Sequence, residues 1–264
     1  MQVPLITAFL ATIILNRGLP DTCLKDGGLY HANSFISPLN INNMTEAVAK
    51  HIKKLHQLEK KGHLEVEDLL KIVKAPNKEY ITPLREMVAQ YHWQPLNDEL
   101  IIPFASWVEA LCIYLEEGAQ GLVKATHKTK DFFSIVFGVL EELPTEEALP
   151  AFLEIAQTFS TKITDEQEDF VKKYAYSLCN ISHQLKGEKA TQDFHEAFVP
   201  ILKQIINFAQ PKKDEMLMCS ATVCFQAFGD KSDIDYLKKL SFTEAYYKST
   251  GETIAKRIEK KYGD

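Results

Sequence analysis

Apolar residues recur at every third or fourth position along most of the chain, and this spacing predicts amphipathic helices. Residues 45–58 show the pattern, with Thr45 at the position of a helix N-cap. Residues 64–73 and 83–91 predict two further helices, whereas segment 19–43, rich in Gly, Pro, Asn and Ser, predicts a long loop. Stretches in which polar and apolar residues alternate are scarce, so the pattern predicts an all-α fold.

Three segments of the second half align on a proline. They read IIPFASWVEALC, ALPAFLEIAQTF and FVPILKQIINFA, and they contain Pro103, Pro150 and Pro200. In each segment the residues two, five and nine positions after the proline are apolar, and these positions fall within about 100° of arc on a helix. Each segment therefore predicts a helix with one apolar face.

A second amphipathic helix is predicted after each proline segment. These helices cover residues 132–143, 166–181 and 215–228. A shorter pair, predicted at 233–240 and 243–262, closes the series. The second half of the chain therefore predicts a succession of helix pairs.

Helix pairs that repeat at intervals of roughly 40–50 residues are typical of α-solenoids. On its three proline segments, region 100–264 resembles the HEAT and armadillo-like superfamily, in which the first helix of a unit often carries a proline kink. The resemblance implies a right-handed α-solenoid of HEAT-like helix pairs. Residues 1–99, with loop 19–43, would form an irregular helical N-terminal region of the same continuous domain. An irregular helical bundle is the alternative.

The opening apolar run from Val3 to Leu15 predicts a retained, buried helix. No Lys or Arg precedes it and no small-residue cleavage pattern follows it, as a secretion signal would require. The run is also shorter than the ~20 residues that a membrane span needs. Pro4 suits a first helical turn, and Arg17 and Gly18 suit a helix end.

Composition and charge narrow the functional classes. The chain has 264 residues, 45% of them hydrophobic, and a net charge of −6. This balance disfavours a general nucleic-acid binder, whose affinity depends on Lys and Arg that neutralise phosphates. The five cysteines are an odd number without CxxC spacing, which favours free thiols in a reducing compartment. We therefore expect a cytoplasmic protein that does not enter a membrane.

Motifs that carry chemistry are not found. The sequence contains no GxxxxGK[ST] loop, no GxGxxG, no HExxH and no GxSxG. His51 and His56 are five residues apart and point in different directions on a helix. We therefore expect no catalytic residue, no metal site and no cofactor.

Acidic residues gather between Glu141 and Asp169. Carboxylates at helix starts meet unpaired N–H groups and the positive end of the helix dipole, so one interpretation is local helix stabilisation. The other is a recognition patch that would attract a basic protein partner. The candidate partner-binding residues are Glu141, Glu142, Glu146, Glu147, Asp165, Glu166, Glu168 and Asp169.

A short basic stretch lies between two predicted helices. It is interpreted as a solvated loop, and its alternative role is to contact an anion or a phosphate. Its candidate residues are Lys124, His127, Lys128 and Lys130.

Two functions follow as hypotheses. The first is a non-enzymatic protein-binding α-solenoid, an adaptor or bacterial immunity-type protein that captures a basic partner. The second is an enzyme or nucleic-acid-binding module on a HEAT-like scaffold, similar to some DNA glycosylases. The chain departs from those glycosylases because it is acidic and matches no catalytic Asp or Trp of their pattern. The sequence does not determine the oligomeric state.

Overall fold

The computed structural model describes residues 44–91, 98–127, 132–159, 161–185 and 191–263. All of them belong to one compact unit, 40–264. The predicted helix at 3–15 and loop 19–43 lie outside the described residues. The division between residues 1–99 and 100–264 stays a prediction.

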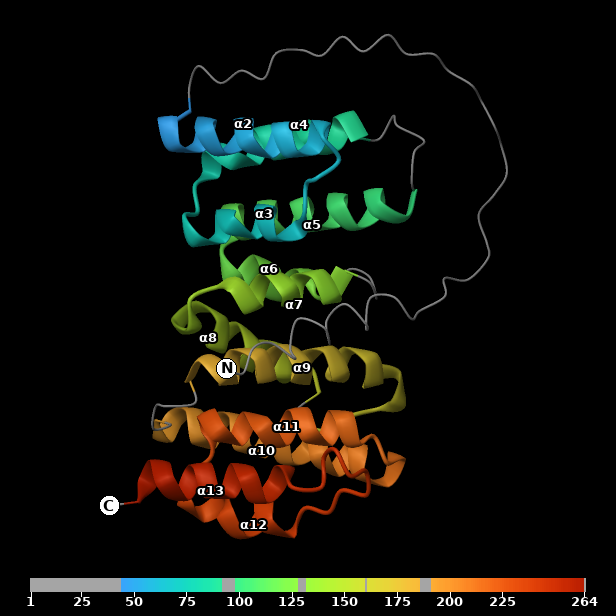
Figure 1. Ribbon diagram of the computed structural model, residues 1–264, viewed down its shortest axis with the longest axis vertical. Coiled ribbons are helices and arrows are strands. Elements are labelled where there is room, and N and C mark those ends of the chain that lie inside the picture. Colours follow the sequence, from blue (N-terminus) through green and yellow to red (C-terminus); the bar gives the residue numbers. More distant parts are fainter. Residues whose placement is uncertain (1–43, 92–97, 128–131, 160, 186–190, 264) are drawn as a thin grey trace. The chain divides into compact units, whose positions relative to one another are not determined.

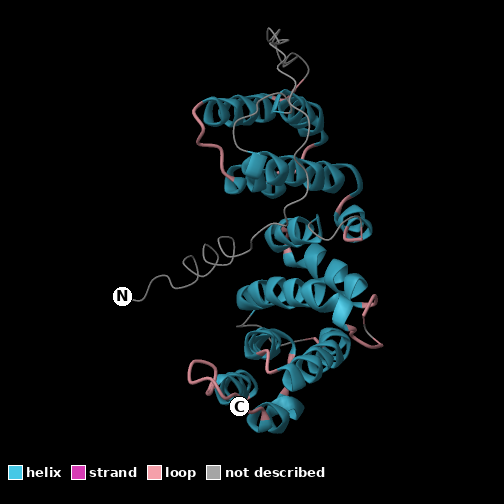
Figure 2. Cartoon of the chain, turned by 90° about the vertical axis from the view of Figure 1, so that its right-hand side faces the viewer, coloured by secondary structure: helices cyan, strands magenta, loops and turns pink. Residues whose placement is uncertain are grey.

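The described residues form twelve α-helices and no strand, which confirms the predicted all-α class (Figure 1; Figure 2). Short 3₁₀ segments join several of them, namely η2 (Lys71–Lys74), η3 (Lys78–Tyr80), η4 (Asp165–Gln167), η5 (Gln210–Lys212) and η6 (Lys231–Asp233). The α-helices are α2 (Glu46–Lys60), α3 (Val66–Leu70), α4 (Ile81–Tyr91), α5 (Asp98–Glu117), α6 (Ala119–Ala125), α7 (Phe132–Glu142), α8 (Thr145–Ala156), α9 (Glu168–Leu185), α10 (Gln192–Ala209), α11 (Glu215–Phe228), α12 (Ile234–Lys239) and α13 (Thr250–Tyr262).

Contacts in this unit run mainly between helices that are close in the sequence. Helix α5 contacts α4, α6 and α7, while α9 packs against α7 and α11. Helix α11 also packs against α10 and α13, and α13 against α12. Figure 1 shows this order as a change of colour from blue at α2 to red at α13. Each helix therefore buries its apolar face against its near neighbours in the chain.

The proline segments show how the sequence pattern produces this packing. Pro103, Pro150 and Pro200 each lie within a helix, in α5, α8 and α10 respectively. Pro150 and Pro200 are exposed. The residues five and nine positions after all three prolines are buried, as the predicted apolar faces require. A proline on the outer face leaves the packed side of the helix undisturbed.

An aromatic cluster joins α7, α8 and α9 in the core. The rings of Phe137 and Phe152 lie 5.6 Å apart, and those of Phe159 and Tyr174 lie 5.0 Å apart at 79°. Such tilted and edge-to-face pairs add about 0.5–1.5 kcal/mol each to the stabilisation that burial provides. The four rings are among the largest fully buried side chains of the described residues.

Two predicted boundaries were wrong. Helix α6 occupies the stretch interpreted as a loop, and Gly118 precedes it with a φ of +70°, which glycine adopts at little cost. The helix predicted at 243–262 begins only at Thr250, because residues 245–249 form turns. None of the helices among the described residues is long and apolar enough to cross a bilayer.

Candidate functional site

The acidic residues lie at the starts of two helices and at the end of a third. Glu146 and Glu147 are in the first turn of α8, and Glu168 and Asp169 in the first turn of α9. Negative charge at these positions favours the helix because the first N–H groups lack intrahelical acceptors. These carboxylates therefore lie on different helices and do not share one element.

Two carboxylates at the start of α9, one just before the helix and one in its first turn, are paired with lysines. Glu168 Oε1 accepts from Lys172 Nζ at 2.6 Å, and its Oε2 accepts from Lys212 Nζ at 2.7 Å. These two hydrogen bonds lower the pKa of Glu168 to about 2. Lys212 also pairs with Asp165, and Lys172 reaches Asp214 Oδ2 at 2.8 Å. The group (Asp165, Glu168, Lys172, Lys212 and Asp214, called here the α9 ion-pair network) largely neutralises itself.

Glu141, at the end of α7, connects that helix to α9. Its Oε2 accepts from Asn180 Nδ2 at 2.7 Å, and its Oε1 accepts from the Ser177 hydroxyl. Lys173 Nζ lies 3.7 Å from Oε1. Glu141 is half-buried and its acceptors are already used, so its role in the structure is to join two helices.

The carboxylates beside α8 have fewer cations around them. Glu146 and Glu147 are exposed, and neither forms an ion pair with another described residue. Glu147 Oε2 accepts a hydrogen bond of 3.3 Å from the Tyr114 hydroxyl. Glu142, at the end of α7, lies 3.9 Å from Lys74 Nζ, which is a distant pair between exposed side chains. The carboxylate of Glu147 therefore keeps capacity for a further donor.

Glu147 also lines a shallow depression between η3, α5 and α8. Two carboxylates, Glu116 and Glu147, and the Tyr114 hydroxyl contribute to it. Glu116 is paired with Arg85 at 3.0 Å, whereas Lys78, which also lines the depression, forms no ion pair with a described residue. The depression is lined by Pro76, Asn77, Lys78, Tyr114, Leu115, Glu116, Gly118 and Glu147.

The remaining acidic candidates differ from one another. Glu166 is exposed and has no ion pair or side-chain hydrogen bond within the described part of the chain. Asp169 is half-buried and has an interaction partner. The eight candidates therefore do not form one continuous group of unpaired charges.

The basic candidates are not brought together as a group. Lys124 lies in α6, not in a loop, and pairs with Glu117 Oε2 at 3.4 Å. The exposed His127 ring stacks on Phe170, with centroids 6.2 Å apart. Lys128 and Lys130 lie outside the described residues. Lys124 and His127 thus already have partners within the chain.

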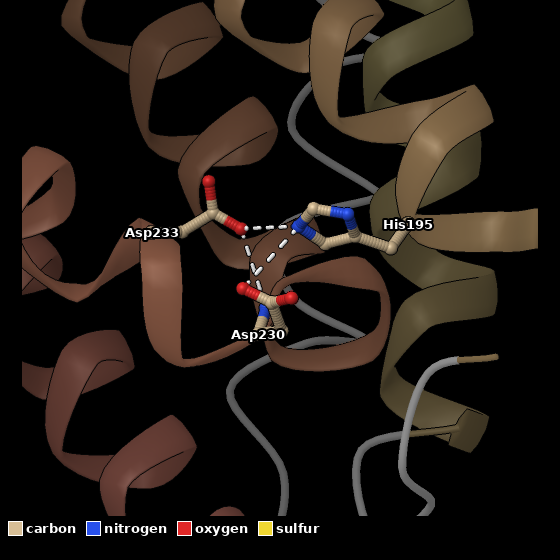
Figure 3. A group of neighbouring side chains, drawn as sticks. All are labelled: His195, Asp230 and Asp233. Carbon is tan, nitrogen blue, oxygen red and sulfur yellow. Dashed lines mark hydrogen bonds and ion pairs between the residues drawn. The ribbon is translucent and has the colours of Figure 1, made fainter. Parts of the chain in front are cut away.

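A third cluster joins α10 to the turn before α12, and the sequence analysis missed it. Figure 3 shows His195, Asp230 and Asp233 pointing toward one another. His195 Nε2 lies 2.9 Å from Asp233 Oδ2 and 3.4 Å from Asp230 Oδ1. His195 and Asp233 are 38 residues apart, and no short motif marks such a spacing.

The donor set of this cluster, one imidazole and two carboxylates, is of a kind that binds divalent metal ions. The oxygens of Asp233, however, already have protein partners. Its Oδ1 accepts from Lys203 Nζ at 2.7 Å, and its Oδ2 accepts from the Asp230 N–H at 3.2 Å. Asp233 is fully buried, and an adjacent ammonium group would repel a cation. The arrangement fits an ion-pair node that fastens η6 to α10 better than a metal centre.

Comparison of the chain with protein-family models, with curated proteins and with solved structures finds no match. The resemblance to HEAT and armadillo-like proteins therefore depends on the proline segments and helix pairs of this chain alone.

Proposed function

We propose that the protein is a non-enzymatic binding scaffold, an adaptor or immunity-type protein whose helix pairs form a right-handed α-solenoid and whose depression beside α8 takes a basic side chain of a partner. Support for the scaffold comes from the order of helix contacts, in which each helix packs on near neighbours in the sequence. Such stacking leaves the exposed faces of many helices available for binding.

The observation that carries the proposal is the environment of Glu147. Its carboxylate lines the depression, accepts one hydrogen bond from Tyr114 and forms no ion pair with a described residue. A guanidinium or ammonium group from outside would supply a charge-assisted bond, and such bonds contribute about 1.5–3 kcal/mol. Glu146, in the same first turn, adds negative charge that would speed the approach of a basic partner.

Glu116 and Lys78 define how specific the site would be. Glu116 is already paired with Arg85, so it offers only a partly neutralised carboxylate. Lys78, which also lines the depression, opposes a second cation, and this favours one inserted basic side chain over a run of them. The partner is therefore expected to present a single prominent Arg or Lys.

The test uses a short peptide with one central Arg as a fluorescent probe, whose anisotropy reports binding. Glu147→Gln should weaken binding by roughly 3–10-fold, because one partly exposed charge-assisted contact is lost. Glu166→Gln is the matched control, since it removes another exposed carboxylate, one that lies outside the depression. Equal loss in the two variants would reject the depression as the site, and no binding by the wild-type chain would reject recognition of a basic side chain.

A nucleic-acid-binding module is the second candidate, and a basic face on α2 favours it. Lys50, Lys53 and Lys54 are exposed there, and together with His51 they line another shallow depression. None of these lysines forms an ion pair with a described residue. Binding of a DNA duplex that falls steeply with salt and is abolished in the Lys53→Gln, Lys54→Gln variant would support this candidate.

A further inference from the structure

The depression beside α8 contains two opposite charges that do not neutralise each other. Glu147, in the first turn of α8, and Lys78, the first residue of η3, both line it, and neither forms an ion pair with a described residue. Glu116 differs from them, because its two carboxylate oxygens lie 3.0 and 3.2 Å from Arg85 Nη2. The depression therefore offers one carboxylate and one ammonium group that have no counter-ion in the described part of the chain.

The backbone that carries Lys78 is anchored on both sides. Asn77 Oδ1 accepts from the Glu79 N–H at 2.9 Å, and Glu79 Oε2 accepts from the Thr45 N–H at 2.7 Å. Tyr80, at the end of η3, is buried. Lys78 itself is exposed and adds no ion pair to this anchoring. Its ammonium group therefore extends from a fixed turn and can be used by a partner.

The acidic side of the depression suits a guanidinium group better than an ammonium group. Tyr114 is buried, and its O–H donates to Glu147 Oε2 at 3.3 Å. Burial, followed by the nearby Glu147 carboxylate, raises the pKa of Tyr114, so the phenol keeps its proton at neutral pH while its oxygen can still accept. The planar fork of a guanidinium can donate to the carboxylate and to the phenol oxygen together, whereas an ammonium acts as a point charge. Arginine is therefore the expected basic residue.

We propose that the depression recognises an arginine together with an acidic residue at most two positions away in the same partner segment. The guanidinium binds Glu147 and the Tyr114 oxygen, and the carboxylate of the partner binds Lys78. Pro76 and Leu115, which also line the depression, provide apolar contact for the stem of the arginine. The inference rests on the function proposed above, because it concerns the same depression and defines its partner more closely.

A side-chain carboxylate fits this site better than the carboxylate at the end of a chain. Terminal carboxylates are commonly captured by several main-chain N–H groups. The N–H of Gly118, which lines the depression, already donates to the Tyr114 carbonyl at 2.7 Å. The N–H of Glu79, next to Lys78, already donates to Asn77. The long, exposed side chain of Lys78 instead supplies a donor that can adjust to a carboxylate on a partner side chain.

The charge of the chain gives the inference a distinctive sign. The net charge is −6, and Glu146 and Glu147 add two carboxylates at the start of α8. Long-range attraction alone would therefore make an acidic residue in the partner weaken binding. A direct contact with Lys78 makes the same residue strengthen binding. The two effects have opposite directions, so one measurement separates them.

The test uses short fluorescent peptides of Ala and Ser with one central Arg, and anisotropy reports binding. Each of the four positions within two residues of the Arg carries Glu in one peptide and Gln in its counterpart. At least one Glu peptide should bind the wild-type chain roughly 2–5-fold more tightly than its Gln counterpart, as expected for one exposed ion pair. The gain should shrink at high salt, which screens exposed charges.

Two variants assign the gain to Lys78. Lys78→Met should abolish it without weakening the binding of the Gln peptides, and Lys78→Glu should turn it into a loss, because two carboxylates then repel each other. Lys162→Met is the matched control, since it removes an exposed lysine outside the depression and should keep the gain. Lys78 has no ion pair with a described residue, so we expect both of its variants to fold as the wild type does.

The outcomes distinguish this inference from the function on which it rests. If no Glu peptide gains on the wild type, or if the gain persists in Lys78→Met, the inference is wrong. Binding of the Gln peptides that weakens in Glu147→Gln would then still support recognition of a single arginine. A peptide with a C-terminal Arg that binds more tightly than every Glu peptide would replace the acidic side chain by a terminal carboxylate and overturn the inference. Absence of binding by all peptides would reject both proposals.

Discussion

The starts of α8 and α9 carry similar carboxylates in the sequence but differ in what surrounds them. At α9, Glu168 is bound by two lysines, and the network extends to Asp165 and Asp214. At α8, Glu146 and Glu147 form no ion pair with a described residue. Both starts gain from the helix dipole, so the dipole does not distinguish them.

The difference arises from the helices that follow. Lys212, in η5 after α10, lies 47 residues from Asp165 and 44 from Glu168. It reaches them because α10 ends beside the start of α9. The start of α8 faces the end of α5, where Tyr114 supplies a hydroxyl and Glu116 a carboxylate. A run of acids therefore becomes either a structural network or an unpaired surface according to its neighbours in space.

Among variants at the two helix starts, removing the lysine that Glu168 and Asp214 share should lower the free energy of unfolding the most. Lys172 is 24% exposed and lies within 2.8 Å of both carboxylates. Lys172→Met keeps most of the stem volume but leaves two carboxylates with one cation fewer, so we expect a loss of about 1–2 kcal/mol in the free energy of unfolding. Urea unfolding measures it.

Lys162→Met provides the control for this variant. Lys162 is exposed and forms no ion pair with a described residue, so its replacement should change stability by less than about 0.5 kcal/mol. Similar losses in the two variants would mean that the α9 ion-pair network contributes nothing beyond general charge.

The pH dependence of stability should reveal the same network, with a smaller effect. The folded-state pKa of Glu168, about 2, lies below the ordinary value of 4.5. Its contribution is therefore complete above pH 4.5 and disappears as the pH falls through about 2. Because the side chain is 30% exposed, solvent screening reduces this contribution to about 1 kcal/mol.

The comparison of wild type with Glu168→Gln isolates that contribution. The difference in unfolding free energy should be about 1 kcal/mol at pH 7 and should vanish near pH 2. Glu166→Gln, which removes an exposed carboxylate without a partner in the described chain, should differ from wild type by less than about 0.5 kcal/mol at pH 7. A difference at Glu168 that stays constant from pH 7 to pH 2 would contradict the role of its ionised form.

Periodicity was sufficient to predict most of the helices. The spacing of apolar residues predicted α11 at its observed limits and α7 and α9 to within a few residues. It failed at α6, because Gly118 and Gly121 are residues typical of loops. In the structure, Gly121 instead packs against Ile113. The spacing also extended α13 over residues 243–249, where Glu215 of α11 instead binds the backbone N–H groups of Thr243 and Glu244.

The sites were less predictable, since their partners are distant in sequence. Composition located the acids, but only the packing of α10 against earlier helices determines which of them meet Lys212. The same applies to His195 with Asp233, which no short motif connects.

The smallest effect on stability is expected at the start of α8. A variant there should lose peptide binding while keeping most of its unfolding free energy. The double variant Glu146→Gln, Glu147→Gln loses two charges from the first turn but no ion pair with a described residue, so the unfolding free energy should fall by about 0.5 kcal/mol. Thermal and urea unfolding measure this change, and anisotropy of the single-Arg peptide measures binding on the same samples. Binding should fall more in the double variant than in Glu147→Gln, since the charge that steers the peptide is also removed. A stability loss above about 1.5 kcal/mol would show that these carboxylates hold the fold as Glu168 does, and the contrast between the two helix starts would then disappear.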